Sequence, residues 1–478
     1  MQDRFAPAIA ANRFGLGARP GELASMAGDP RGWLSAQLKG APPEVAEAGL
    51  RGSADVLAEA IDLRRDVREM RKEKRAAPQE GASSGAEPSS AAVQAFMKLP
   101  QIYRPVYMNE VTARLRHAVS TDRPFVERLT QFWANHFAVS VDKIAVLGLA
   151  GTLEREAIRP NVLGNFTDLL LAVEHHPAML LYLDNHLSVG PNSRAARLLA
   201  RRQAGRQVGL NENLAREILE LHTLGVNGGY TQKDVTTFAQ VITGWSIGGE
   251  GGRFSRGEPG KFVFRPEVHE PGAKSVLGKR YSQDGEAQGI AVLRDVAASP
   301  ATAKFIATKL ARHFIADEPP PEAVEHLAKA FTHGHGDLPT LYRAVIDMPA
   351  AWSQPFAKYK TPNDYIVSTF RGLAQPVASG RVGVASFELL GQRTYGPGSP
   401  AGWPDRSVDW DGASALMKRI EWADAVGQRV GAHRNAAELA PDLLGEALST
   451  ETRTAIARAA SGAQALTLML TAPEFLRR

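Results

Sequence analysis

The sequence predicts a mainly α-helical protein: one multi-helical domain over residues 1–478, with a small β-hairpin and long polar loops. Three observations support this class. Apolar residues recur at helical spacing along most of the chain, residues typical of helix starts precede many of these segments, and a single short region has the pattern of paired strands. The 478 residues exceed the roughly 250–300 at which one core usually stops growing, so two closely packed domains also fit the length.

The N-terminal part begins with a helical pattern over residues 30–63, in which Pro43 is well placed to start one segment. Residues 64–92 interrupt it with dense mixed charge followed by a tract rich in Gly, Ser, Ala and Pro. Such a composition cannot bury a core. We therefore expect a flexible, low-complexity insertion over 64–92.

A helical block follows to about Leu183, in which Asp122 and Pro124 mark the start of a buried helix that reaches Phe137. Residues 188–209 contain several arginines together with Gly, Pro and Asn, so we predict an exposed polar loop there. The next predicted helix runs from Asn211 to His222.

The second half begins with Thr231 and Asp234, which form a capping-box pattern for a helix to about Thr243. Residues 261–264 and 275–281 have strand patterns, which predicts a β-hairpin over 260–282. The remaining predictions are helices over 301–315, 321–332, 338–347 and 362–373, a loop over 391–411 and terminal helices over 412–478.

Composition excludes several classes of function. The net charge of +5 is small and its basic residues are scattered, so nucleic acid is not an expected partner. The chain has no cysteine, which excludes disulfides and thiol catalysis. The longest apolar stretch, residues 144–151, is far shorter than the roughly 20 residues of a membrane span, so we expect no membrane insertion. Residues 1–16 lack a signal pattern, and the compartment stays open.

Several segments resemble the bacterial domain-of-unknown-function family 1800, and together they cover nearly the whole chain except the 64–92 insertion. The matching segments are Asn12–Gly17, Phe132–Phe137, His176–Leu180, Asn211–Glu217, Glu220–Val226, Gly228–Gln232, Thr243–Trp245 and Pro400–Asp405. The resemblance implies no established activity. Members are often encoded beside a sulfatase-like family with twin-arginine signals, which implies an envelope role and a possible sulfatase-like exported partner. The location is then either cytoplasmic or, by co-export, periplasmic.

The helix over 211–222 carries the densest set of candidate functional residues. Helical geometry places Asn213, Glu217 and Glu220 on one face with Arg216 beside it, whereas His222 turns to the apolar side, where we expect a structural role. In one hypothesis Glu217 and Glu220 are a general acid and base, and Asn213 and Arg216 orient a polar substrate. In the other these charges only form surface ion pairs.

His136, Asp184 and Asn185 extend this candidate site. His136 falls near a helix end, where a side chain can reach a cleft, and Asp184 and Glu217 could act as the acid and the nucleophile of one reaction. Carboxyl separations of about 5–5.5 Å or about 6.5–9.5 Å would then distinguish retaining from inverting glycosidases. Alternatively, Asp184 or Asn185 caps the next segment, and His136 is a buried structural histidine.

Three further residues are candidates for substrate binding. Trp245 could stack on a sugar ring or could pack a loop onto the core, and His269 and Lys274 could bind substrate or lie solvated on the hairpin loop. The alternating histidines of residues 333–337 have the look of a metal motif, but Asp337 is explained as a helix N-cap. We predict no metal site, and the cofactor is unknown.

Two functions follow from these patterns. The first is a hydrolase or lyase that acts on a polar polymer such as a glycan through Glu217 and Glu220, with help from Asp184 and His136. The second is a non-catalytic escort or assembly partner of the sulfatase-like exported protein. The sequence leaves the choice between enzyme and binding protein open.

Overall fold

The computed structural model describes residues 3–76, 90–202, 209–249, 256–377 and 380–478. Helices make up most of this part of the chain, and strands occur there in two short antiparallel pairs. The mainly α-helical class predicted from the sequence is confirmed.

The elements up to residue 241 are all helical. They are η1 (Asp3–Phe5), α1 (Ala6–Ile9), η2 (Ala10–Phe14), α2 (Glu22–Met26), α3 (Pro30–Gln37), α4 (Ser53–Ala76), α5 (Ser90–Ser120), α6 (Pro124–His136), α7 (Ala150–Thr152), η3 (Leu153–Ile158), η4 (Arg159–Asn161), α8 (Phe166–Glu174), α9 (Pro177–Tyr182), η5 (Asn185–Leu187), α10 (Arg194–Arg202), α11 (Asn213–Glu217), η6 (Ile218–His222) and α12 (Gln232–Val241).

The later elements include both strand pairs. They are β1 (Trp245–Ile247), β2 (Phe262–Phe264), β3 (Lys274–Val276), β4 (Lys279–Tyr281), α13 (Glu286–Ala297), α14 (Pro300–Phe314), α15 (Pro321–His333), α16 (Leu338–Asp347), η7 (Pro349–Trp352), α17 (Pro362–Gly372), α18 (Gly380–Leu389), η8 (Ser407–Asp409), α19 (Ala413–Val430), α20 (Ala436–Leu444), η9 (Gly445–Ala447), α21 (Thr450–Ala457), α22 (Gly462–Leu470) and α23 (Pro473–Leu476).

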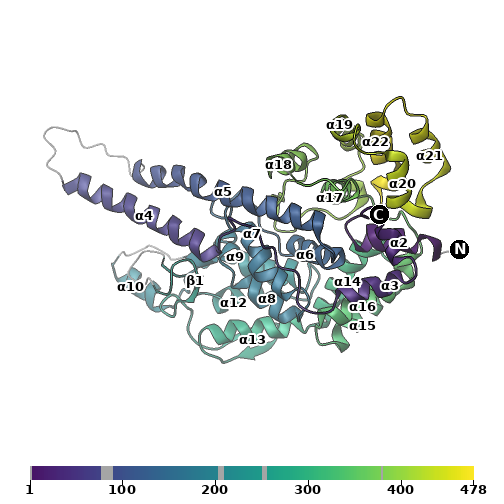
Figure 1. Ribbon diagram of the computed structural model, residues 1–478. Helices are drawn as coiled ribbons and strands as arrows, with labels where there is room; N and C mark the ends of the chain where they lie inside the picture. Colours follow the sequence, from purple (N-terminus) through teal and green to yellow (C-terminus); the bar gives the residue numbers. More distant parts are fainter. Residues whose placement is uncertain (1–2, 77–89, 203–208, 250–255, 378–379) are drawn as a thin grey trace.

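Helices α4 and α5 pack side by side and project from the body as a long arm (Figure 1). Helix α4 has 24 residues, which corresponds to about 36 Å at 1.5 Å per residue. The expected insertion over 64–92 is thus helical up to Ala76 and again from Ser90, while its middle part lies outside the described residues. The predicted helix start at Pro43 is wrong, because residues 42–47 have no regular secondary structure and α4 begins only at Ser53.

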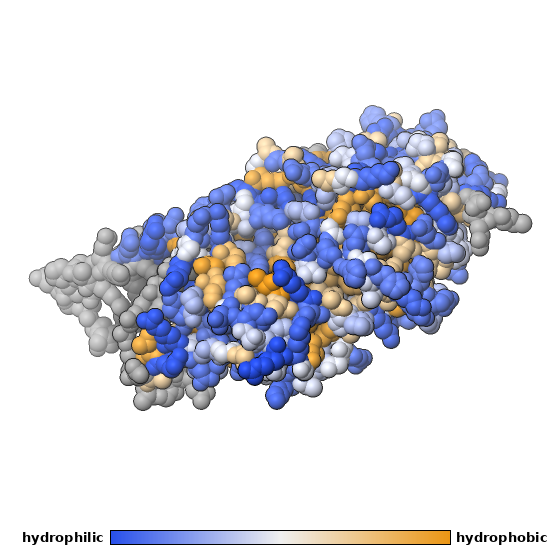
Figure 2. Space-filling model, turned by 90° about the horizontal axis from the view of Figure 1, so that it is seen from below, coloured by the Kyte–Doolittle hydropathy of each residue, from blue (hydrophilic) through white to orange (hydrophobic). Residues whose placement is uncertain are grey.

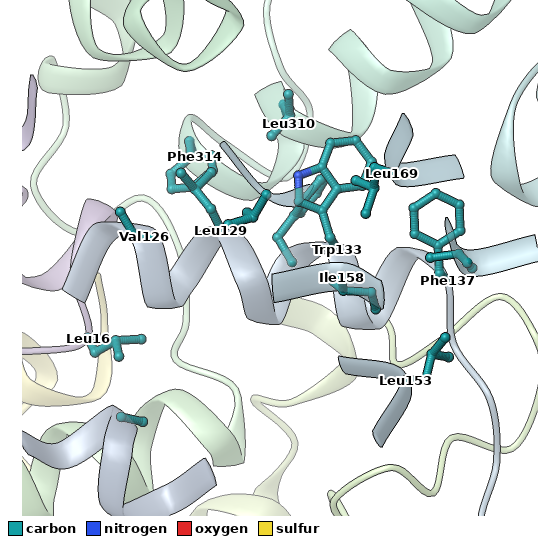
Figure 3. Packing of buried hydrophobic residues seen from close by; sticks show 14 of the residues in the cluster. Leu16, Val126, Leu129, Trp133, Phe137, Leu153, Ile158, Leu169, Leu310 and Phe314 are labelled. Carbon is teal, nitrogen blue, oxygen red and sulfur yellow. The ribbon is translucent and has the colours of Figure 1, made fainter. Parts of the chain in front are cut away.

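Helix α6 passes through the middle of the body, and apolar side chains surround it (Figure 3). Its apolar positions repeat at helical spacing, and Phe125, Leu129 and Trp133 are fully buried. Trp133 also donates its indole N–H to the hydroxyl of Tyr342 at 2.6 Å, which satisfies a polar atom that would otherwise be costly to bury. The buried helix that the sequence predicts here is confirmed.

The strand pairing differs from the predicted one. The two predicted strands do not pair with each other, because β2 pairs with β1, with Trp245 opposite Phe264, and β3 pairs with β4. The segment 275–281 folds back on itself at Leu277 and Gly278, whose φ angles of 53° and 77° are those of a tight two-residue hairpin turn. A small hairpin therefore exists, but it is formed within residues 274–281.

The predicted polar loop over 188–209 contains helix α10, so it is not a loop throughout. The hydroxyl of Ser193 accepts a hydrogen bond from the backbone N–H of Ala196 at 3.1 Å, as a capping residue at a helix start does. An Ala, Leu and Arg sequence with high helix propensity follows. Gly190 and Pro191 lie before this helix, Gly209 lies after it, and Gly205 lies outside the described residues.

The buried hydrophobic side chains of the described residues form one cluster from Ile9 to Leu476. On the face shown in Figure 2 hydrophilic residues prevail, and hydrophobic residues form separate patches among them. Among the helices that the structure describes, we find none with both the length and the apolar character that a bilayer crossing requires.

Candidate functional site

The helix predicted over 211–222 is formed by α11 and, in its second half, by the wider π-helical turn η6. Leu214 and Ile218 are fully buried on its core side. On the other side Asn213 is exposed, and Glu217 and Glu220 are half-buried. The predicted amphipathic arrangement is confirmed.

The charged residues of this helix form local contacts. Arg216 pairs with Glu212 one turn earlier at 3.0 Å, and the described residues show no Arg216–Glu220 ion pair. Glu220 accepts a hydrogen bond from the hydroxyl of Tyr230 at 3.4 Å. The Arg216–Glu212 ion pair lies at the surface, where such pairs contribute little to stability.

Glu217 and Asp184 both lie around Tyr182. Burial raises the pKa of Glu217, and nearby Glu220 adds to this effect. Burial also raises the pKa of Tyr182, with a contribution from the charge of Glu217. Asp184 accepts from Lys143 at 2.7 Å, and the same ammonium donates to the backbone carbonyl of Tyr182 at 3.0 Å.

Asn185 and Trp245, predicted to bind substrate, have structural positions instead. Trp245 is fully buried, its ring centroid is 4.4 Å from that of His175, and it is therefore inaccessible to a sugar. Asn185 is 1% exposed and donates its amide to the carbonyls of Ile242 and Trp245 at 3.2 and 3.1 Å. Both residues serve the packing of η5 on β1, and the predicted substrate contacts stay predictions that this burial does not favour.

Lys274 and His269 stabilise the loop that precedes β3. The ammonium of Lys274 donates to the carbonyls of Glu270, Pro271 and Gly272 at 3.1, 2.9 and 2.7 Å, so its three N–H donors are all used. Nδ1 of His269 lies 2.9 Å from the carbonyl oxygen of Thr243. These contacts favour a structural role for Lys274, and His269 is tied to the end of α12; substrate binding by the two residues stays a prediction.

His136 is buried at the C-terminal end of α6. Its Nε2 lies 3.1 Å from the backbone carbonyl oxygen of His222, which can only accept, so Nε2 carries the proton. Its Nδ1 is then a free acceptor, and it has no hydrogen-bond partner among the described residues. Burial holds the pKa of His136 well below its usual value, and the charges of Lys309 and His222 add to this effect.

His222 fits the structural role expected from its apolar position. It is 1% exposed, and its Nδ1 lies 2.8 Å from a carboxylate oxygen of Glu174, which is fully buried on α8. The contact between His222 and Glu174 joins η6 to α8 next to His136. The partner of His222 Nδ1 is thus a carboxyl group rather than a backbone carbonyl.

A cavity of about 350 Å³ opens beside His136. Its walls come from the C-terminal half of α6, one side of α14, the start of α17 and the loop 392–409, together with Arg114 of α5 and part of η3. Two segments that carry the family resemblance, Phe132–Phe137 and Pro400–Asp405, meet at this cavity. Of the predicted catalytic residues, His136 lines the cavity, whereas Glu217, Glu220 and Asp184 do not.

The loop wall is fixed to α6 by Asn135. Its amide donates to the carbonyl of Trp403 at 2.9 Å, and its carbonyl oxygen accepts from the N–H of Trp403 at 2.7 Å. Gly402 has a φ angle of 84°, and a Cβ at this position would lie 2.3 Å from the backbone oxygen of Asn135. A glycine is therefore required for the loop to approach α6 this closely.

Asp405 lies at the charged end of the cavity. Its carboxylate is 3.1 Å from Nδ1 of His313 and 3.7 Å from both Lys358 and Arg478. Although burial opposes the change, these partners hold the pKa of Asp405 below its usual range. Burial lowers the pKa of His313 to about 4 against the opposing charge of Asp405, so His313 is neutral at pH 7.

Asp364 continues this charge network deeper in the protein. Its two carboxylate oxygens lie 3.1 Å from Arg128 and 2.9 Å from Arg478. The three side chains are at most 6% exposed. Asp364 and Asp405 are thus both paired with cations inside the protein.

Lys309 and Arg312 lie one turn apart on the cavity side of α14, whereas Leu310 and Phe314 face the core (Figure 3). Within the described part of the chain, the ammonium of Lys309 makes neither a hydrogen bond nor an ion pair, and it lies 5.6 Å from the ring centroid of Phe305. Burial lowers the pKa of Lys309 to about 8, with Asp405 opposing and Arg312 adding to this effect. Arg312 donates to the carbonyl of Asp317 at 3.2 Å and has no carboxylate partner among the described residues.

The other cations of the lining are neutralised, since each pairs with a carboxylate: Arg114 with Glu154, Arg128 with Asp364, Arg393 with Asp142 and Arg406 with Glu318. Asp409 is exposed where it lines the cavity. We find no cluster of three or more metal-ligating side chains among the described residues.

Sequence reasoning missed Lys309, Arg312, His313, Asp364 and Asp405. Two signals were present in the sequence: Lys309, Arg312 and His313 share the i, i+3, i+4 spacing of one helix face, and Asp405 ends a family segment. Neither signal reveals that residues about 90 positions apart meet at one cavity.

The chain belongs to the family described as "Protein of unknown function (DUF1800)", whose model matches residues 9–477. No curated protein and no solved structure matched the chain.

Proposed function

We propose that this protein binds a small anionic molecule in the cavity between α6, α14 and the 392–409 loop. The observation that carries the proposal is the pair Lys309 and Arg312, two cations on one wall that have no carboxylate partner among the described residues. Withdrawing a charge from water without a partner is costly, and an anionic ligand offsets that cost.

The size and charge of the cavity support this ligand class. Its volume of about 350 Å³ lies near the lower end of the range for ligand pockets, roughly 300–1,000 Å³, which fits a molecule of a few carbons or the end of a longer one. Six cationic and four carboxylate side chains line it. Since Asp364 and Asp405 are already paired, the excess charge that faces a ligand is positive.

A thermal-shift titration of the full chain tests the proposal, with phosphate, sulfate, pyruvate and citrate as ligands and glycerol as a neutral control. A ligand at 100 times its Kd stabilises the folded state by about 2.7 kcal/mol. We expect at least one anion to raise Tm, and K309M and R312M to reduce that shift.

Lys329 provides the matched control. It is an exposed lysine on α15 that pairs with Glu325 and does not line the cavity, so K329M should leave the anion-induced shift unchanged. The proposal fails if no anion stabilises the protein, or if K329M and K309M reduce the shift equally.

A second candidate function is the hydrolase or lyase that acts on a polar polymer through Glu217 and Glu220. The observation that favours it is the raised pKa of Glu217, since a carboxyl group that acts as a general acid must hold its proton near neutral pH. If this function is correct, E217Q or E220Q should abolish cleavage of candidate glycans while the variants stay folded. Unchanged cleavage by both folded variants contradicts it.

A further inference from the structure

We infer that the amine of Lys309 forms an imine with the carbonyl group of a small anionic oxo compound, whose acidic group Arg312 holds. This inference rests on the proposed anion-binding function and deepens it, because it assigns covalent chemistry and a substrate class to the same cavity.

The surroundings of Lys309, which is half-buried, differ from those of the buried lysines Lys274 and Lys358. The ammonium of Lys274 is used by three carbonyls, and that of Lys358 pairs with Asp317 at 2.6 Å. Lys309 has no such partner among the described residues, although it lines the cavity from a 15-residue helix. A lysine with a structural role would donate to an acceptor of the protein, whereas the nitrogen of Lys309 is available to a ligand in the cavity.

The chemistry of an imine requires an unprotonated amine. Burial together with the charge of Arg312 lowers the pKa of Lys309 to about 8, despite the opposing carboxylate of Asp405, so a sizeable fraction of the amine is neutral at mildly basic pH. Lysines are activated as nucleophiles in this way, by desolvation and by a neighbouring cation.

Arg312 sets the type of carbonyl compound. Residues at i and i+3 on a helix have their Cβ atoms about 5–6 Å apart, so Lys309 and Arg312 can hold two groups of the same small molecule. An oxo acid presents such a pair, with its carbonyl toward the amine and its carboxylate toward the guanidinium. The guanidinium keeps its two terminal nitrogens for this contact, because only its Nε donates to Asp317.

The reaction balances without any further reagent. The Lys309 nitrogen attacks the carbonyl carbon, the nitrogen loses a proton and the carbonyl oxygen gains one, and the resulting carbinolamine loses water to form the C=N bond. His136 lines the same cavity, and its ring lies within electrostatic reach of Lys309.

Reductive trapping tests this inference on the full chain. The protein is incubated with pyruvate or glyoxylate and sodium cyanoborohydride near pH 8, and adducts are located by peptide mass spectrometry. We expect at least tenfold more adduct at Lys309 than at Lys304, an exposed lysine on the same helix. The comparison is made within one wild-type sample, so it does not depend on the folding of any variant.

Two variants separate this inference from the proposed function. K309R keeps the positive charge, so it should retain anion binding while it loses the adduct. R312M should lower the pyruvate adduct at Lys309 to the level that neutral acetaldehyde gives. Equal labelling of Lys304 and Lys309 contradicts the imine, even where anions still stabilise the protein. If anions do not stabilise the protein either, the proposed function fails as well.

Discussion

Substituting Asp364 by Asn tests how far the buried charge network stabilises the wall of the cavity. The carboxylate lies between the guanidinium groups of Arg128 and Arg478, and all three side chains are at most 6% exposed. Removing one partner of a buried ion pair typically costs about 3–5 kcal/mol, because the other charge stays buried without compensation.

The expected value lies at the lower end of that range. Arg128 keeps its hydrogen bonds to the carbonyls of Gly15 and Asn12, and Arg478 keeps Asp405 at 3.7 Å. We therefore expect D364N to reduce the free energy of unfolding by about 3 kcal/mol, a large part of the 5–15 kcal/mol typical of a folded protein.

Guanidinium unfolding followed by tryptophan fluorescence measures this change. The matched control is D122N, because Asp122 is 88% exposed and pairs with Arg19 at 2.6 Å. An exposed pair contributes at most about 1 kcal/mol. A loss below about 1 kcal/mol for D364N, or equal losses for the two variants, would refute the argument that burial makes this pair important.

Three further predictions concern the same structure. The pKa values of Asp364 and Asp405 in the folded state lie below the unfolded value of about 3.9. The stability that these carboxylates provide is therefore present above about pH 4 and is lost as the pH falls further. From about pH 5 to about pH 3, Tm should decrease more steeply in the wild type than in D364N. N135A should cost about 1–3 kcal/mol, because it leaves the backbone groups of Trp403 without partners, and should also weaken anion binding in the thermal-shift titration. W245A should cost about 3–5 kcal/mol in chemical unfolding, and a variant of unchanged stability would contradict its placement in the core.

Local signals in the sequence predicted the helices well. The capping box of Thr231 and Asp234 and the N-cap at Asp337 depend on residues three positions apart, and the structure has both. Proline at the first position of α6 is a similar local signal. These interactions are visible in a short window, which explains why the mainly α-helical class and the family were predicted correctly.

Long-range contacts were not predictable in the same way. The pairing of β1 with β2 joins segments that are separated by residues 248–261, so strand patterns alone did not identify the partner. Likewise, the cavity joins α6, α14 and a loop after residue 390, and the spacing of Lys309 and Arg312 on one helix face does not show which distant segments they meet. Among the carboxylates, Glu217 was identified from local density, and its catalytic role, the polymer substrate and the sulfatase-like partner stay predictions.

The position of helix α14 limits which substitutions can alter the ligand preference of this protein. Leu310 and Phe314 fill the core from the same helix that presents Lys309 and Arg312 to the cavity, so a repacking substitution on one side shifts the reactive groups on the other. The opposite wall is a loop tied to α6 through the backbone of Trp403, so apart from Gly402 and Asp405 its side chains are less constrained than those of α14. Divergence in ligand preference should therefore accumulate along the loop, while α14 changes slowly; engineering of specificity should start from the loop as well.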